Sequence, residues 1–140
     1  MGRLAWTALV LEVFLGLGAL GGGAALMLGP HGEILPLPVA ALADSPFADY
    51  FVPGAILFSV LGVGPLVAAV LTARRSRSTP LLAVAVGIAL LTWMVVEIAI
   101  VGYTNTPPLQ AFYLVLGVAI VLVGAALSRT RASRRRSSAP

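Results

Sequence analysis

The sequence has no cysteine, no lysine and a single histidine, His31, and only 10% of its 140 residues are charged. Without cysteine the chain can form no disulfide, thiolate nucleophile or cysteine-bound metal site. One histidine is too few for the usual multi-histidine zinc sites. The sequence also shows no nucleotide-binding loop and no HExxH pair. We therefore expect no metal, no cofactor and no enzymatic activity.

Apolar residues make up most of the chain. They account for 59% of the residues, and the mean hydropathy is +1.02. A soluble domain carries about 25% charged residues, and a chain of this length cannot bury so much apolar surface in water. The sequence therefore predicts an integral membrane protein. Strands are excluded, because apolar and polar residues do not alternate and an open sheet cannot lie in lipid.

The apolar residues form four runs, each close to or above the ~20 residues that a helix needs to cross a bilayer. The runs are Leu4–Leu28, Gly54–Ala73, Leu81–Val101 and Leu109–Leu127. They predict an all-α, polytopic four-helix bundle over residues 1–128, with an ordered outer loop over 29–53. Residues 129–140 are poor in apolar side chains and rich in arginine, so we expect a disordered tail there.

All nine basic residues are arginines, and they cluster at the ends of alternate runs. The arginines are Arg3, Arg74, Arg75, Arg77, Arg129, Arg131, Arg134, Arg135 and Arg136. The positive-inside rule then puts both termini and the second loop in the cytoplasm. Arginine without lysine, together with much Ala, Gly and Val, is typical of a GC-rich bacterial genome. The predicted location is the bacterial inner membrane.

A signal peptide over Leu4–Leu28 is the alternative for the first run, with Ala41-Leu42-Ala43 as its cleavage motif. Signal peptides have a shorter apolar region that ends closer to the cleavage site. We therefore prefer a membrane-spanning first helix.

Hydroxyl-proline pairs mark the expected helix starts. Thr79-Pro80 and Thr106-Pro107 precede the third and fourth runs, because a hydroxyl caps free N–H groups and proline fits the first helical position. By the same argument, Ser45-Pro46 predicts a short interfacial helix over 46–52. Pro53-Gly54 predicts a break before the second helix.

Two carboxylates, Glu12 and Glu97, lie inside apolar runs. An acid at the bilayer centre costs ~2.5–3.5 kcal/mol on insertion scales, so such a residue is a candidate functional site. Glu12 lies toward the arginine side of its helix and Glu97 toward the other side, ~15 Å apart along the membrane normal. Glu12 is a candidate proton or cation site; a neutral, hydrogen-bonded acid is the structural alternative.

Polar and aromatic residues from three segments converge on the outer side near Glu97. We predict an outer polar pocket, and the alternative is an ordinary aromatic belt at the interface. The candidate pocket residues are Glu97, Asp49, Tyr50, Trp93, Tyr103, Asn105, Gln110 and Tyr113.

Glycine and proline suggest special packing in two helices. Pro65 follows two glycines near the middle of the second run, which predicts a helix kink. Gly18 and Gly22 form a GxxxG pair that predicts close helix packing, either within the monomer or in a homodimer. Ala83/Gly87 and Gly117/Gly124 are expected to have the same packing role.

Two motifs carry a resemblance to a known group. The SPFxxYxxPG element spans Ser45–Gly54, and the W…E…G…LQ…Y element runs from Trp93 to Tyr113. Together they resemble a family of small four-helix bacterial membrane proteins that are functionally uncharacterised, so the resemblance implies a fold and no activity. Glu12 is also similar in position to a helix-one carboxylate that binds protons and cations in small multidrug exporters. The long first loop and the arginine tail depart from the exporters.

We predict a non-enzymatic accessory, scaffold or sensor component of an inner-membrane assembly. The alternative is a proton-coupled transporter or channel that uses an intramembrane glutamate. The expected partners are the lipid bilayer, anionic headgroups around the arginine tail, and a second copy or a larger membrane complex. Because the arginines follow membrane topology, no nucleic acid is expected.

Overall fold

The computed structural model describes residues 1–104 and 108–140, and this part of the chain contains helices and no strand. The elements are α1 (Arg3–Leu28), η1 (Val39–Leu42), α2 (Phe51–Ile56), η2 (Leu57–Val63), α3 (Gly64–Ala73), α4 (Thr79–Val101) and α5 (Leu109–Ser137). α2, η2 and α3 follow one another without a gap and form one span. Within the described residues, four spans are long and apolar enough to cross a membrane. The prediction of an all-α bundle of four membrane-spanning helices is confirmed.

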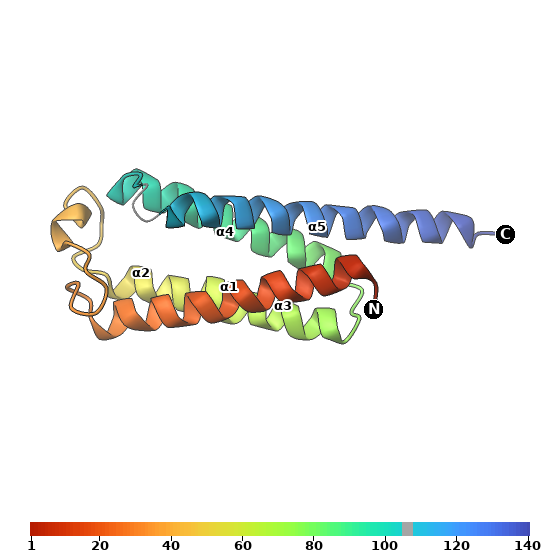
Figure 1. Ribbon diagram of the computed structural model, residues 1–140, viewed down its shortest axis with the longest axis horizontal. Helices are drawn as coiled ribbons and strands as arrows, with labels where there is room; N and C mark the ends of the chain where they lie inside the picture. The colour runs from red at the N-terminus through yellow and green to blue at the C-terminus, as the bar shows by residue number, and fades with distance from the viewer. Residues whose placement is uncertain (105–107) are drawn as a thin grey trace.

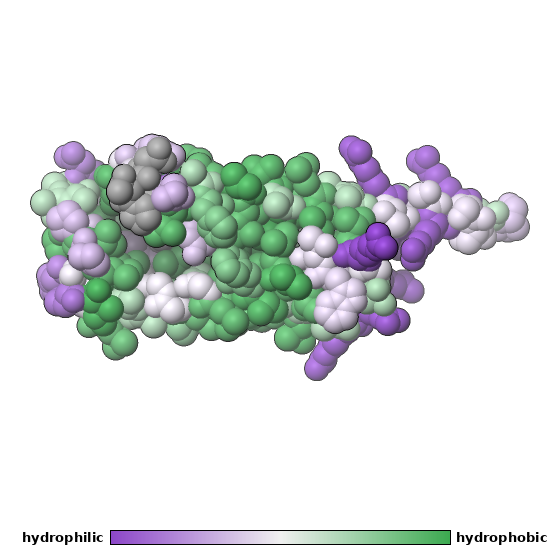
Figure 2. All heavy atoms as spheres, in the orientation of Figure 1, coloured by the Kyte–Doolittle hydropathy of each residue, from purple (hydrophilic) through white to green (hydrophobic). Residues whose placement is uncertain are grey.

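The spans form two helix pairs that lie side by side (Figure 1). One pair joins α1 to the α2–η2–α3 span, the other joins α4 to α5, and contacts within each pair are the most extensive in the molecule. Both termini lie at one end and the long first loop lies at the other (Figure 1). Figure 2 shows an apolar band between two hydrophilic ends, as expected for a bilayer-spanning molecule.

Glycines let the helices of each pair approach closely. A Cβ built on Gly23 would lie 2.7 Å from the Gly54 carbonyl oxygen, and one on Gly16 would lie 3.0 Å from the Gly62 oxygen. The expected role of Gly87 agrees with the structure, since its Cβ would lie 2.9 Å from the Gly117 oxygen. At these distances a side chain would collide with the partner's backbone, so the helices require glycine here.

Within the monomer, Gly18 and Gly22 do not make the close helix contacts that were one of the two alternatives for the GxxxG pair. Gly18 is exposed and Gly22 is half-buried, and a Cβ at either would make only ordinary contacts of 3.6 and 3.5 Å. The close-packed glycines are Gly16 and Gly23, two turns apart. The sequence of α1 has small residues all around the helix, so spacing alone could not select the face.

Between the two pairs lies an apolar core. Leu15, Leu61, Leu90 and Ile120 come from four different spans, and each is at most 2% exposed. This apolar layer joins the two pairs into one bundle.

The helix distortion predicted at Pro65 takes the form of a π-helical segment, η2, immediately before the proline. Pro65 has no N–H to donate to the Leu61 carbonyl, and its ring would clash with that carbonyl in a regular α-helix. The π segment widens the turn, and the Gly64 N–H instead reaches back five residues to the Ser59 oxygen.

Residues 129–137 are helical, which corrects the prediction of a disordered tail over 129–140: α5 continues to Ser137. Low apolar content argued for disorder, but alanine and arginine are good helix formers. Extending an existing helix also avoids the cost of nucleation. Arg134, Arg135 and Arg136 in the last turn interact favourably with the helix dipole.

The first loop has a different local structure from the predicted helix over 46–52. A 3-10 helix, η1, forms earlier, and the Ser45 hydroxyl donates to the Leu42 carbonyl (2.8 Å), closing that turn. α2 begins at Phe51, so Pro53-Gly54 lies in the first turn of α2 and does not interrupt the helix. Proline is tolerated there because the first N–H groups of a helix have no intrahelical partner.

Candidate functional site

Glu97 lies at the centre of a small polar cluster at the loop end of the bundle. Its Oε2 accepts a hydrogen bond from Trp93 Nε1 (3.1 Å), one turn earlier in α4. Its Oε1 accepts from Gln110 Nε2 (3.4 Å) in the first turn of α5. Three of the predicted pocket residues therefore meet, and they link α4 to α5.

Gln110 is only 4% exposed and is bonded at both ends of its amide. Its Nε2 also donates to the Gly102 carbonyl (3.0 Å), where α4 ends, and its Oε1 accepts from the Thr104 N–H (2.7 Å). Gly102 has φ +81°, which favours glycine at this position. Gln110 thus holds the end of α4 against α5, a role that the sequence reading missed.

Tyr50 is a structural anchor of the first loop. It is 4% exposed and packs with Leu26 and Leu42 in a second apolar cluster. Its hydroxyl donates to the Pro38 carbonyl (2.9 Å), and its N–H donates to the Pro30 carbonyl (2.9 Å). Burial raises the pKa of the Tyr50 hydroxyl, and the nearby charge of Glu97 raises this pKa further. Tyr50 therefore lies near Glu97, but its hydroxyl and its N–H are used to hold the first loop together.

The Asp49 and Tyr113 side chains have partners outside this cluster. The Asp49 carboxylate accepts from the Phe51 N–H (2.9 Å) at the start of α2. Tyr113 packs against the apolar core and on Phe112, whose ring centroid is 5.3 Å away. Tyr103 is 55% exposed. Asn105, like the Thr106-Pro107 helix start, lies outside the described residues.

Glu12 forms a separate buried site toward the other end of the bundle. Its side chain is fully buried, and its Oε2 accepts from the Thr72 hydroxyl (3.0 Å) near the end of α3. Its Oε1 has no hydrogen-bond partner among the described residues, and the buried Thr79 hydroxyl has none there either. Thr79 is the first residue of α4 and does not cap it, contrary to the sequence prediction. No pattern in the sequence indicates that Thr72 would meet Glu12.

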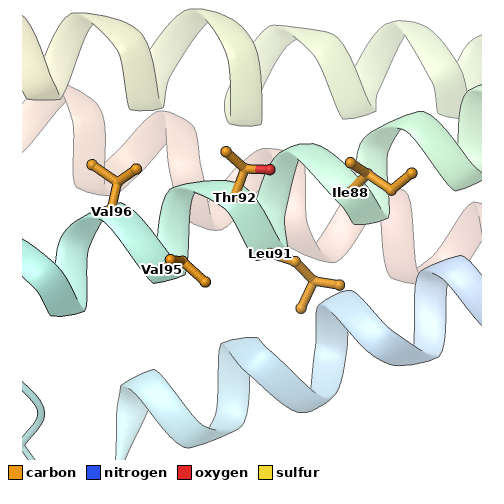
Figure 3. A pocket seen from close by; sticks show the side chains of 5 residues that line it. All are labelled: Ile88, Leu91, Thr92, Val95 and Val96. Carbon is orange, nitrogen blue, oxygen red and sulfur yellow. The ribbon is translucent and has the colours of Figure 1, made fainter.

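Two open pockets lie on the surface, and neither is lined by Glu12 or Glu97. One is a groove along α4, where Ile88, Thr92 and Val96 point to one side and Leu91 to the other (Figure 3). The second lies at the arginine end, between the start of α4 and the end of α5.

His31 and Glu33 form an exposed ion pair in the first loop, with 3.4 Å between Nδ1 and Oε1. Hydrogen bonding to backbone N–H groups lowers the pKa of the Glu33 carboxyl, and the interaction with His31 lowers it further. The described residues contain no group of three or more His, Cys, Asp or Glu side chains placed to hold a metal ion.

The four spans and the apolar band make this chain a small integral membrane protein. No family model, curated protein or solved structure matches it. The resemblance to the four-helix bacterial family therefore stays a prediction.

Replacing Tyr50 with phenylalanine should destabilise the first loop by about 1 kcal/mol, since it removes the hydrogen bond to Pro38 and keeps the apolar packing. The parent protein should also lose stability as the pH rises above 10. The raised pKa means that the unfolded chain loses this proton first, so the stability contribution is complete below pH 10 and declines above it. Limited proteolysis of the loop between pH 8 and pH 11 measures both effects. A Tyr50→Phe protein with the same alkaline loss as the parent would contradict the assignment.

Proposed function

We propose that this chain is a non-enzymatic accessory, scaffold or sensor component of a bacterial inner-membrane assembly, with its arginine end in the cytoplasm. The observation that carries the proposal is that the polar side chains of the outer cluster hydrogen-bond within the fold. Glu97 accepts hydrogen bonds from both Trp93 and Gln110, and Gln110 also donates to the Gly102 carbonyl at the end of α4. Polar side chains whose hydrogen bonds are made within the fold favour a rigid recognition surface over a catalytic centre.

The folded first loop supplies the surface for such a partner. In this loop, Ile34 and Leu37 are 54% and 39% exposed. Tyr50 holds the loop in place through its hydrogen bond to the Pro38 carbonyl. Exposed apolar side chains on an ordered element are typical of protein contacts. An ordered loop also loses little conformational entropy on binding.

Photo-crosslinking in native membranes tests this proposal. A crosslinker placed at Leu37 should capture one defined protein, whereas one at Leu122, on the exposed side of α5, should label lipid. Ile34→Ser with Leu37→Ser should reduce the captured protein at least tenfold. Asp44→Ser, an exposed change in the same loop, should leave capture unchanged. Equal capture by all variants, or none from the parent, would refute the accessory role.

A proton-coupled transporter is the second candidate, and Glu12 is the observation in its favour. A fully buried carboxyl with an oxygen that lacks a partner among the described residues is costly. Such groups in membrane proteins mark proton relays. The unpartnered hydroxyl of Thr79 would offer a second polar group to a proton or a water molecule.

Under this alternative, Glu12→Gln should abolish proton-driven transport in proteoliposomes. The glutamine amide keeps the shape of the side chain but cannot take up and release a proton as the carboxyl does. Thr72→Val should alter the pH dependence of transport, since it removes the one hydrogen bond that the carboxylate accepts. Glu97→Gln is the matched control and should transport normally. Transport that survives Glu12→Gln would exclude the transporter mechanism.

A further inference from the structure

A basic pocket lies where the start of α4 meets the helical extension of α5. It has a volume of about 410 Å³, and its lining includes Arg77, Leu81, Ser128, Arg131 and Arg135. The pocket exists because α5 stays helical beyond the membrane span: Ser128, Arg131 and Arg135 are spaced three and four residues apart and therefore share one face of the helix.

Arg131 is held in place by the protein itself. Its Nη1 donates to the carbonyl oxygens of Ser76 (3.1 Å) and Arg77 (3.0 Å) in the loop before α4. These bonds leave the Nε and Nη2 donors of the guanidinium for another acceptor. A guanidinium fixed in this way is prepared for bidentate binding of a phosphate or carboxylate.

The positive charge of the pocket has no internal counterpart. Residues 50–96 and 98–140 contain no Asp or Glu, and Glu12 is fully buried. Across the described part of the chain, the only ion pair is the one between His31 and Glu33 in the first loop. Three arginines that line one pocket without a carboxylate attract an anion from outside the chain.

The pocket continues into an apolar face of α4. Leu81 lines the pocket, and Ile88 and Val95 follow it at intervals of seven residues, so all three lie on one side of the helix. They are 71%, 53% and 63% exposed. Ile88 and Val95 also line the groove of about 320 Å³ shown in Figure 3. Ile88 lies ~10 Å beyond Leu81 along the helix, within the ~15 Å that one leaflet's hydrocarbon occupies.

We infer that this pocket binds one anionic phospholipid. The phosphate lies against Arg77, Arg131 and Arg135 at the membrane surface, and an acyl chain follows Leu81 and Ile88 toward the bilayer centre. The charge selects an anionic headgroup over a zwitterionic one. The adjoining apolar face selects a lipid over a soluble phosphate compound.

Lipid titration followed by native mass spectrometry tests the site, with phosphatidylglycerol as the probe and phosphatidylcholine for comparison. Arg77→Gln with Arg135→Gln should weaken phosphatidylglycerol binding about 25-fold, since each arginine near the surface contributes about fivefold. Neither side chain makes a hydrogen bond within the described part of the chain, so this variant should fold. The control Arg74→Gln with Arg136→Gln also changes one loop arginine and one α5 arginine, but neither lines the pocket. It should weaken binding less than threefold, because solvent and salt screen charges that do not line the pocket.

Three results would overturn the inference. Equal loss in both double variants would mean that general charge attracts the lipid. Equal affinity of the parent for both lipids would mean that the headgroup charge is not recognised. Displacement of the lipid by glycerol phosphate at equal concentration would make the ligand a soluble phosphate compound.

Discussion

Gly23→Leu should lower the free energy of unfolding by about 3 kcal/mol, because it inserts a side chain where two helix backbones meet. A Cβ at Gly23 would lie 2.7 Å from both the Gly54 oxygen and the Phe58 nitrogen. Backbone atoms cannot rotate aside as a flexible side chain can. The α2–η2–α3 span would therefore have to move away from α1, and the packing along the pair would be lost with it. Reversible unfolding in mixed micelles measures the change.

Gly21→Leu is the matched control, because in the described part of the chain no atom beyond the nearby backbone of α1 itself lies within 4 Å of a Cβ at that position. It should leave stability within about 0.5 kcal/mol of the parent. Gly18→Leu distinguishes packing within the monomer from a homodimer. Since Gly18 is exposed, a homodimer that forms through this face would dissociate in the variant, while the stability of each monomer would stay the same. Equal destabilisation by the Gly21 and Gly23 variants would contradict the packing described here.

The spans could be predicted from sequence because lipid leaves few alternatives. A run of about 20 apolar residues must hydrogen-bond its own backbone, and a helix does so. The face of a helix is harder to predict. In α1, glycines at 16, 18, 21, 22 and 23 surround much of the helix. Only the contacts with Gly54 and Gly62 show which of them pack closely.

The ends of the spans were less predictable, because local polar contacts decide them. Asp49 and Ser45 both take part in turns before α2, and these bonds place its start at Phe51. Hydropathy carries no information on such contacts. The arginine segment after α5 shows the same limit, since low hydropathy does not distinguish a solvated helix from a disordered chain.

The candidate site was predictable where its members are neighbours in sequence. Trp93 and Glu97 are one helical turn apart, and Gln110 follows a short connection, so their proximity follows from the topology. The bond between Glu12 and Thr72 joins residues 60 positions apart. It depends on the register of α1 against α3, which the glycine contacts fix and the sequence pattern does not.

Gln110→Met should destabilise the protein by about 2 kcal/mol, although methionine matches glutamine in length. The substitution removes the acceptor of the Thr104 N–H (2.7 Å) and the donor to the Gly102 carbonyl (3.0 Å). Each partly buried backbone group that loses its partner costs about 1 kcal/mol or more. The end of α4 would then separate from α5, and hydrogen exchange of the Gly102 N–H would accelerate.

Glu97→Gln is the comparison that isolates this effect. The amide oxygen of the new side chain can still accept from Trp93 Nε1, so stability should change by less than about 1 kcal/mol. If Gln110 joins the two helices, the Gln110 variant must lose more stability than the Glu97 variant. The increase in its amide hydrogen exchange must also be confined to the loop end of the bundle. Equal losses would instead make the Glu97 charge the main support of the cluster.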